Sequence, residues 1–578
     1  QHVAADHQRI GRRMQGDVRG RVAQAQAAGP VATAHVQDHA GCQRLRQRRA
    51  VHRALQAWQL GLTTRTAELG THGQCGRTSR TGLDVVSARG LGHRFGRRFT
   101  LRLSRRFRRM HGRRHGRTHL SHRQGCRLCV LLALARGFAH PGAGFAGDRL
   151  QPANDLAEYG QLDALVFECL AERTIALAQQ RKSEGVSAGF DGKLLGRLEG
   201  AMPHLAARGG VAITNAGAAS PREAAIAVAA ESHRWAERPL RVAAVTGDDV
   251  LQLLDFSGAV VLETGEPLAS YRDRVVSANA YLGSSGVTTA LRAGADIVIT
   301  GRTSDAALFE GTLSALHGWQ AHDQNQVAQG LMIGHLLECA AQLSGGYFAD
   351  GVTKVVPELW NVGFPMADVS PDGVAVLHKL IGTGGRIDRQ TVLEQLLYEV
   401  DDPSCYKTPD LAVDFSSVEL VDLCNDQVRV SGCLPVEVPQ TLKVSVGIRD
   451  GFAAIGTIVY GGIHSIQRAS IATEIMQERW AKIYGRNPEE ISSSVLGVNA
   501  TAPWVNQVSE APDEVIVRFT LRTFDEKLAA AFCGEVESLY TNGPAGGGGA
   551  TASYSSTIGV VSTLIPTGLV EQKVEFFQ

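Results

Sequence analysis

The stretch GADIVITGRTSDAALF, residues 294–309, places a short apolar run directly before a polar turn. The run, Asp296–Thr300, follows a helical pattern at Val287–Ala293 and precedes Arg302 and Asp305. An apolar run of this length, bounded by turn residues and helices, is typical of a buried strand in a parallel sheet. The stretch therefore predicts one strand–helix unit of an α/β fold.

Three other segments repeat this arrangement. Strands are expected at Leu162–Glu168, Val211–Asn215 and Leu240–Thr246. Helical patterns follow at Cys169–Arg181 and from Pro221 onward, where proline is favoured in a first helical turn. Strands that alternate with helices predict a largely parallel sheet with flanking helices, which we expect over residues 141–370.

Polar side chains stand at the end of each expected strand. They are Glu168, Asn215, Asp248 with Asp249, and Arg302 with Asp305. Ligands bind at the carboxyl ends of strands in parallel sheets, because loops and helix N-termini converge there. Each residue alone could equally cap a helix, but four strands that deliver polar groups to one edge favour a site.

Two other motifs carry candidate site residues. The segment Asn279–Gly283, which includes Tyr281, precedes a turn and a helix, so its amides could hold an anion, although a plain loop is the alternative. The run Leu331–Leu343 has helical periodicity and brings His335 and Glu338 within one turn. Such a pair can share a proton or a metal, or can simply be a helix contact.

The hydrophobic pattern changes beyond about residue 370, where longer stretches of alternating apolar and polar residues indicate strands. They predict an α+β second part, residues 371–578, with a domain boundary within 360–385. Thr441–Ile448 and Phe452–Tyr460 are expected to form an antiparallel hairpin that turns at Arg449-Asp450-Gly451. The remaining expected elements are Val374–Lys379, Gln427–Ser431, helix Ile466–Tyr484, strand Glu514–Leu521 and helix Asp525–Tyr540.

Charge divides the chain unevenly. Residues 1–140 carry 28 Arg, no Lys and five acidic residues, a net charge of +23, whereas residues 141–578 carry −21. A basic arm could bind nucleic acid, and an apolar core after Arg127 could belong to a targeting segment. The Arg, Gly, Ala and His bias without Lys favours a third interpretation, a disordered extension or a segment translated in the wrong frame.

Composition bounds the remaining function classes. With 44% hydrophobic and 20% charged residues in 578, most of the chain should fold into several domains. No apolar run approaches the roughly 20 residues that span a bilayer, so we expect no membrane segment. The ten cysteines show no disulfide spacing, which fits a reducing cytoplasm.

Glycine-rich loops occur at Gly382–Gly385 and Gly546–Gly549, but neither has the spacing of a phosphate-binding loop or a dinucleotide fingerprint. The sequence therefore predicts no cofactor and leaves room for a divalent metal.

Many ordered motifs resemble the acyclic terpene utilisation protein A family over residues 142–578. The first group is GDRLQPA (147–153), LVFECLAERTIALAQ (165–179), TNAGAASP (214–221), VTGDDV (245–250), NAYLG (279–283) and GADIVITGRTSDAALF (294–309). The second group is GHLLECAAQLSGGYFAD (334–350), GTGG (382–385), LLYEVDDPSCYKTPDLAVDFS (396–416), LKVSVGIRDGF (442–452) and EVESLYTNGPAGGGG (535–549). Members usually open with a hydrophobic strand before the segment equivalent to Gly147-Asp148. Residues 135–141 fill that place here, so we expect the first strand to be missing.

The resemblance implies a cytoplasmic role in the catabolism of branched isoprenoids such as citronellol and geraniol, through acyl-CoA thioesters. A lyase or hydratase step would suit the residues at the strand ends. The candidate catalytic residues are Glu168, Asp248, Asp249, Asp305, His335 and Glu338. The candidate substrate-binding residues are Asp148, Arg149, Asn215, Gly217, Asn279, Tyr281, Arg302, Gly345 and Gly346.

Two other functions compete with this hypothesis. The first is a non-catalytic partner of a neighbouring pathway enzyme, with a homo-oligomer as a further alternative for the partner. The second is nucleic-acid binding through residues 1–140, which the absence of Lys and of interleaved aromatic residues disfavours. We therefore expect a small-molecule substrate and neither a nucleic-acid nor a membrane partner.

Overall fold

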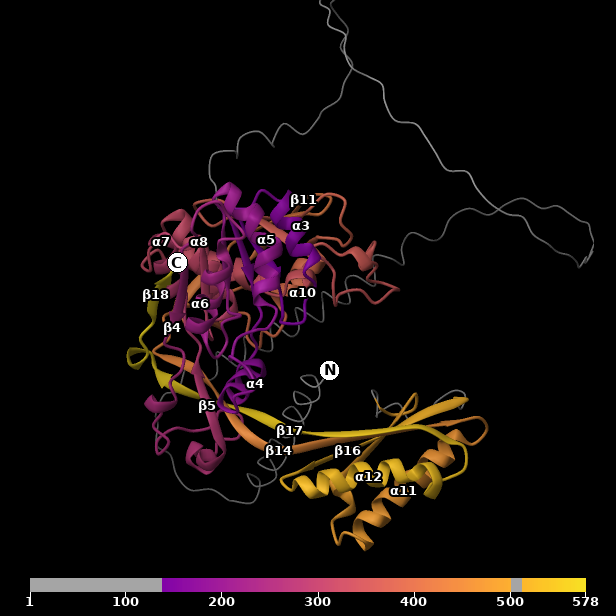
Figure 1. Cartoon of the computed structure of the whole chain (residues 1–578). Coiled ribbons are helices and arrows are strands. Elements are labelled where there is room, and N and C mark those ends of the chain that lie inside the picture. The colour runs from indigo at the N-terminus through magenta and orange to yellow at the C-terminus, as the bar shows by residue number, and fades with distance from the viewer. Residues whose placement is uncertain (1–137, 501–511) are drawn as a thin grey trace, which may run out of the picture. The chain divides into compact units, whose positions relative to one another are not determined.

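The computed structural model describes residues 138–500 and 512–578 (Figure 1). The expectations for the Arg-rich segment, residues 1–140, lie outside the described residues except at 138–140, which belong to a strand.

A ten-stranded mixed sheet forms the centre of the fold. Its middle is parallel, in the order β1 (Phe138–Ala143), β2 (Ala164–Phe167), β3 (Val211–Thr214), β6 (Ile297–Thr300), β4 (Val242–Thr246). Antiparallel strands continue it on both sides: β7 (Pro365–Val369), β8 (Ala375–Lys379), β12 (Gln427–Ser431) and β11 (Glu419–Cys424) beyond β1, and β18 (Lys573–Phe577) beyond β4. The predicted α/β class is confirmed.

Helices cover both faces of the parallel strands, since alternate strand residues pack in opposite directions. Leu165 and Phe167 face a core formed with α3 (Gln151–Tyr159), α5 (Leu194–Arg208) and α6 (Pro221–Ser232). On the other face Ala164 and Val166 join a core formed with three further helices: α7 (Ser285–Arg292), α8 (Asp305–His317) and α9 (Gln324–Leu337). Burial on both faces explains why these strands read as continuous apolar runs.

The expectation of a missing first strand is wrong. Residues 138–143, FAHPGA, form β1, which pairs parallel with β2 and antiparallel with β7. Pro141 is tolerated because β7 pairs only with Phe138 and Ala139, so the absent amide proton costs no bond on that side. Small buried residues, Ala139 and Ala143, let this strand fit between its neighbours.

A second sheet is antiparallel, with the order β15 (Ile491–Leu496), β16 (Glu514–Thr523), β14 (Thr441–Gly461), β17 (Gly547–Pro566). Helices α11 (Ser465–Lys482) and α12 (Glu526–Asn542) lie on one face of it (Figure 1). The first half of β14 also pairs with β5 (Val275–Ala280). The antiparallel α+β character expected for the later part of the chain is therefore confirmed.

The predicted hairpin at Arg449–Gly451 is wrong, because β14 continues through it as one 21-residue strand. Both halves pair with β17, and the register shifts between Arg449 and Phe452. Gly451 has φ +71°, so the glycine makes a bulge in the ladder and not a chain reversal.

The helix expected over Leu331–Leu343 begins earlier, at Gln324, and also ends earlier. Helix α9 ends at Leu337, and a separate 3-10 turn covers Ala340–Gln342. Ala340 has φ +44°, which interrupts the helical hydrogen-bond pattern.

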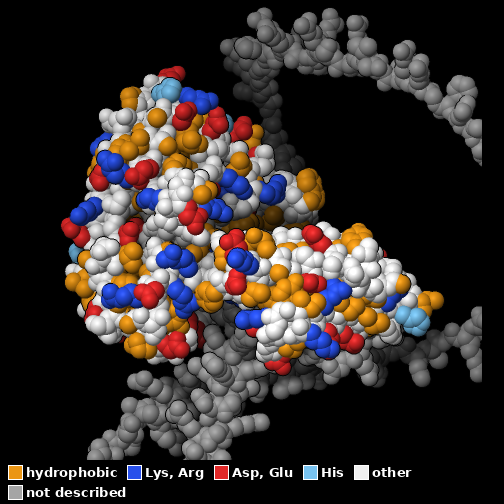
Figure 2. All heavy atoms as spheres, turned by 60° about the horizontal axis from the view of Figure 1, so that its bottom comes forward, with side chains coloured by type: hydrophobic (Ala, Val, Ile, Leu, Met, Phe, Trp, Pro, Cys, Tyr) orange, Lys and Arg blue, Asp and Glu red, His pale blue; other side chains and the backbone are white. Residues whose placement is uncertain are grey.

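The other elements complete the described chain. They are α4 (Glu172–Ser183), α10 (Arg389–Leu396) and a small sheet of β13 (Leu434–Glu437), β10 (Ala412–Asp414) and β9 (Tyr406–Lys407). No helix within the described ranges has both the length and the apolar character needed to cross a bilayer. On the face shown in Figure 2, basic and acidic side chains are interspersed and form no patch of a single sign.

Candidate functional site

Four strand ends bring their polar residues to one edge of the parallel sheet. Asn215, after β3, donates from Nδ2 to Glu168 Oε1, after β2, at 2.9 Å. The backbone amide of Arg302, after β6, donates to Asp248 Oδ2, after β4, at 3.0 Å. Asn279 Nδ2 donates to the same Asp248 oxygen at 2.9 Å. The carboxyl edge is therefore one connected polar network.

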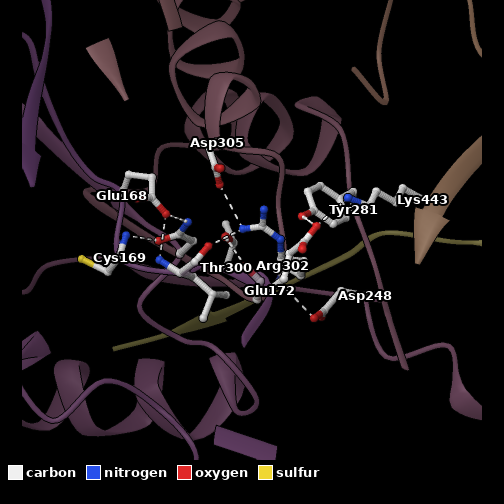
Figure 3. A network of polar contacts seen from close by, with 12 residues as sticks. Glu168, Cys169, Glu172, Asp248, Tyr281, Thr300, Arg302, Asp305 and Lys443 are labelled. Atoms are coloured by element: carbon white, nitrogen blue, oxygen red, sulfur yellow. Dashed lines mark hydrogen bonds and ion pairs between the residues drawn. The ribbon is translucent and has the colours of Figure 1, made fainter. Parts of the chain in front are cut away.

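Arg302 lies at the centre of this network and is only 2% exposed (Figure 3). Its Nη1 donates to the Leu170 carbonyl and, at 2.9 Å, to Asp305 Oδ1. Its guanidinium carbon lies 4.0 Å from the centroid of the Tyr281 ring. The guanidinium group is thus bonded to Leu170 and Asp305 and stacked on Tyr281. Through Asp305 it fixes the first turn of α8.

A second branch of the network lies beside Tyr281. Glu172 Oε1 accepts from the Tyr281 hydroxyl and from Lys443 Nζ, each at 2.6 Å (Figure 3). Burial raises the pKa of Glu172, but the charge and hydrogen bond of Lys443 lower it further, so that its pKa lies below the ordinary value. Burial raises the pKa of Tyr281. At neutral pH the carboxylate of Glu172 therefore accepts from a neutral phenol.

A cavity of about 510 Å³, called the first cavity below, opens beside Glu168. Its acidic lining residues are Asp148, Glu168, Asp305, Glu338 and Glu399. No basic side chain lines it among the described residues. Gly346 and the cysteines Cys169 and Cys339 contribute to the wall. The cavity therefore gathers carboxyl groups from β2, α8 and the end of α9.

Glu168 is held as a carboxylic acid at neutral pH. Burial, and then the charge of Asp305, raise its pKa to about 8. Its Oε1 accepts from the Leu170 amide at 2.7 Å and from Asn215, and its Oε2 has no hydrogen bond to any described residue. A proton on Oε2 is therefore available to a ligand in the first cavity.

His335 and Glu338 form a buried pair behind the same cavity. His335 Nδ1 lies 2.9 Å from Glu338 Oε1, and its Nε2 lies 3.2 Å from the Leu396 carbonyl. A carbonyl only accepts, so Nε2 carries a proton and a second proton is shared between Nδ1 and Oε1. Burial lowers the pKa of His335, but the charge of Glu338 and these hydrogen bonds raise it above its ordinary value. The pair can therefore exchange a proton.

A second cavity, of about 560 Å³, lies on the other side of Asp305. Tyr281 and Lys443 line it together with Lys407 and Glu437. Asp305 lines both cavities, so the Arg302–Asp305 ion pair stands between them.

The remaining predicted residues have other surroundings. Asp248 and Asn279 are buried in the network but line neither cavity. Asp249 is exposed and accepts from the Leu251 amide. Arg149 is exposed and donates to the Trp360 carbonyl at 3.5 Å.

Two predicted glycines serve packing or a turn. A Cβ at Gly217 would lie 2.6 Å from the Thr300 carbonyl oxygen, so this glycine lets β3 and β6 approach. Gly345 has φ +100° and forms the turn before Gly346. Asp148 lines the first cavity and also accepts from the Gly144 amide at 2.9 Å.

Sequence reasoning missed Glu172, Lys443 and Glu399. Glu172 opens α4, where an acidic residue is expected for helix stability alone. Lys443 belongs to β14, far along the chain, and only the pairing of β14 with β5 brings it to Tyr281. The described residues contain no group of three or more His, Cys, Asp or Glu side chains placed to hold a metal ion.

Comparison with known proteins gave one match. A family model described as "Acyclic terpene utilisation family protein AtuA" matches residues 140–576. No curated protein and no solved structure matches the chain.

Proposed function

Because the chain belongs to the acyclic terpene utilisation family AtuA, we propose that it is a cytoplasmic enzyme of branched isoprenoid catabolism that adds or removes water, or splits a carbon–carbon bond, by acid–base chemistry. The substrate class is a branched acyl-CoA thioester or a related carboxylate. The six cysteines in the described part of the chain are all free, which fits a reducing compartment.

One observation carries the proposal, namely the protonated carboxyl group of Glu168 on a cavity that also contains Glu338. A general acid must hold its proton at working pH and reach the reacting atom. Glu168 meets the first condition because burial raises its pKa to about 8, and the second because it lines the first cavity.

The proposed step uses the two carboxyl groups in different roles. Glu338, when its shared proton resides on His335 Nδ1, accepts the proton on the carbon next to the thioester carbonyl. Glu168 donates its Oε2 proton to the leaving hydroxyl group, which departs as water. The reverse sequence adds water, and no other reactant is needed.

Arg302 has a positioning role in this scheme. Its Nη1 fixes Asp305 and the Leu170 carbonyl, so that Glu168, which accepts from the Leu170 amide, keeps its orientation. Lys407 and Lys443 in the second cavity supply positive charge for an anionic part of the substrate.

The first experiment is a thermal-shift screen of the full chain against branched acyl-CoA thioesters, free CoA, nicotinamide dinucleotides and divalent metals. A ligand that binds only the native state raises the unfolding midpoint. We expect the branched thioesters to raise it most. Absence of any shift with thioesters and CoA would contradict the proposed substrate class.

The variant Glu168→Gln then tests the acid. It keeps the oxygen that accepts from Leu170, but its amide has no acidic proton to transfer, so turnover should fall about 10²–10⁴-fold with binding retained. Glu399→Gln is the matched control, because Glu399 is an exposed carboxyl group on the same cavity. Equal losses of turnover in both variants would mean that the negative charge of the cavity, and not the proton of Glu168, determines the rate. This result would contradict the role assigned to Glu168.

An exposed apolar segment keeps the non-catalytic alternative as a second candidate. Val352, Val355 and Trp360 are 82%, 60% and 79% exposed on one loop region, as is common at protein contacts. If purified protein binds a thioester but converts none, the partner function replaces the enzyme function.

A further inference from the structure

The second sheet ends in a long strand without charged residues. No Asp, Glu, Lys or Arg occurs between Glu537 and Glu571, and this interval contains the whole of β17, residues Gly547–Pro566. Ser, Thr, Gly and Ala dominate its first half, GGGATASYSST.

β17 is the edge strand of its sheet, and only half of that edge is covered. Along the second half, the Leu262 amide donates to the Ser562 carbonyl at 2.8 Å, and the Ser562 amide donates to Glu263 Oε2 at 2.9 Å. Along Gly547–Thr557 the backbone pairs with no described strand other than β14, and the Gly549 amide also donates to the Tyr540 hydroxyl at 3.1 Å. This first half, residues 547–557, is called the open edge below.

Proteins normally protect such an edge with charge, proline or shortness. The other end strands of the two larger sheets do so: β15 has only six residues, β11 contains Glu419 and Asp422, and β18 contains Lys573 and Glu575. The open edge has no charge and no proline, and its one irregularity is the bulge at Gly549, where the register with β14 shifts. It is therefore built to accept another strand.

A second copy of this chain is the occupant that the open edge fits. When a strand pairs antiparallel with its own copy about a two-fold axis, residue i faces residue j and j faces i, so the two copies of any charge near the axis come close together and repel. The open edge contains none. Tyr540 and Tyr554, 55% and 39% exposed beside this edge, add apolar surface to such a contact.

We propose that the open edge of β17 pairs antiparallel with the same segment of a second copy, which joins two five-stranded sheets into one of ten strands. The pairing leaves the first and second cavities on each copy unchanged, so it is independent of the proposed function.

The test is the mass of the full chain by sedimentation velocity at tens of micromolar. The variant Ser553→Lys/Ser555→Lys places like charges along the open edge, on the sheet face opposite α12. The matched control, Ser492→Lys/Ser494→Lys, has the same spacing on β15, the opposite edge of the same sheet. We expect twice the chain mass for the wild type and the control, and the mass of one chain for the β17 variant, with an unchanged circular dichroism spectrum.

Three results would overturn the proposal: a wild type of single-chain mass, a β17 variant that stays a dimer, or a β15 control that dissociates. Hydrogen exchange on the unmodified chain decides the matter if the β17 variant does not fold. Amides of residues 547–557 should exchange more slowly as protein concentration rises. Protection that does not depend on concentration would instead mean that this chain or another molecule covers the edge, and the proposal fails.

Discussion

At the scale of single residues, Glu168 owes its proton to burial and to the charge of Asp305, and its hydrogen bond from Asn215 acts in the opposite direction. The Asn215 amide stabilises the ionised form, so its removal should raise the pKa of Glu168 above about 8. Turnover that needs the acid should fall in the wild type as pH rises through about 8, and Asn215→Ala should move this decline to higher pH.

The measurement is kcat/KM against pH for the wild type, Asn215→Ala and Asn279→Ala. Asn279 bonds to Asp248 and not to Glu168, so its variant should keep the midpoint of the wild type. A decline that moves to lower pH in Asn215→Ala, or moves equally in both variants, would show that another group limits the rate.

Arg302 and Arg222 allow a comparison of buried and exposed ion pairs. Arg302→Met leaves Asp305 and the Leu170 carbonyl without their donor, and we expect a loss of about 2–4 kcal/mol in the free energy of unfolding, since Asp305 is partly solvated. Arg222→Met breaks an exposed pair with Glu575 and should cost less than about 1 kcal/mol. Urea denaturation measures both, and equal losses would contradict the central place of Arg302.

The residues of the candidate site that lie at strand ends could be predicted from the sequence. Glu168, Asn215, Asp248 and Arg302 each follow an apolar run, and parallel pairing alone places them on one edge. Glu172 and Lys443 were not predictable, because their contact depends on a ladder between residues that are far apart in the sequence. Nor could periodicity show that Arg302 is buried and bound to protein partners.

At the scale of elements, the correct predictions rest on local sequence patterns, and the wrong ones concern elements that depend on partners far away in the sequence. The parallel strands carry their own signal, because each is a short apolar run between helices. The length of β14 could not be predicted from its own sequence. Arg449-Asp450-Gly451 has the composition of a turn, and pairing with β17 on both sides of this segment keeps the chain extended. β1 was missed because FAHPGA, with a histidine and a proline, lacks a strand pattern until β2 and β7 flank it.

β1 makes stability depend on pH through His140, which is 1% exposed. Burial, with a smaller contribution from His378, lowers the pKa of His140 well below its usual value. The unfolded chain takes up a proton near pH 6.5 and the folded chain does not, so this contribution to stability is lost as pH falls below about 6.5.

The variant His140→Asn tests this dependence, because its side-chain oxygen can still accept from the Ala367 amide as Nδ1 does at 3.2 Å. Urea midpoints at pH 7.5 and pH 5 should differ less for His140→Asn than for the wild type. His464→Asn, at an exposed position, is the control. An unchanged pH dependence in His140→Asn would show that other groups produce it.

At the scale of the whole molecule, β18 joins the last residues of the chain to the first half of the fold. It pairs antiparallel with β4 over Lys573–Phe577, and the guanidinium carbon of Arg241 lies 4.6 Å from the centroid of the Phe576 ring. Removal of β18 bares the edge of a buried, apolar strand.

Deletion of residues 573–578 should therefore lower the thermal midpoint and produce larger species in sedimentation. Phe576→Ala/Phe577→Ala removes the two rings but keeps the backbone ladder, so it should lower the midpoint less and stay monodisperse. If the double variant is as damaging as the deletion, the aromatic side chains, and not the strand, protect β4.

The pairing of β4 with β18 also imposes an order in time. β4 is complete at residue 246, whereas its partner begins at residue 573. A ribosome that adds about 5–20 residues per second needs roughly 15–65 seconds for the intervening roughly 330 residues. Throughout that interval the edge of β4 in the nascent chain has no partner strand. Other nascent chains, on ribosomes of the same messenger RNA, lie close by and expose the same apolar strand. The yield of soluble protein in a cell therefore depends on the speed of translation and on the chaperones near the exit tunnel, as well as on the stability of the finished fold.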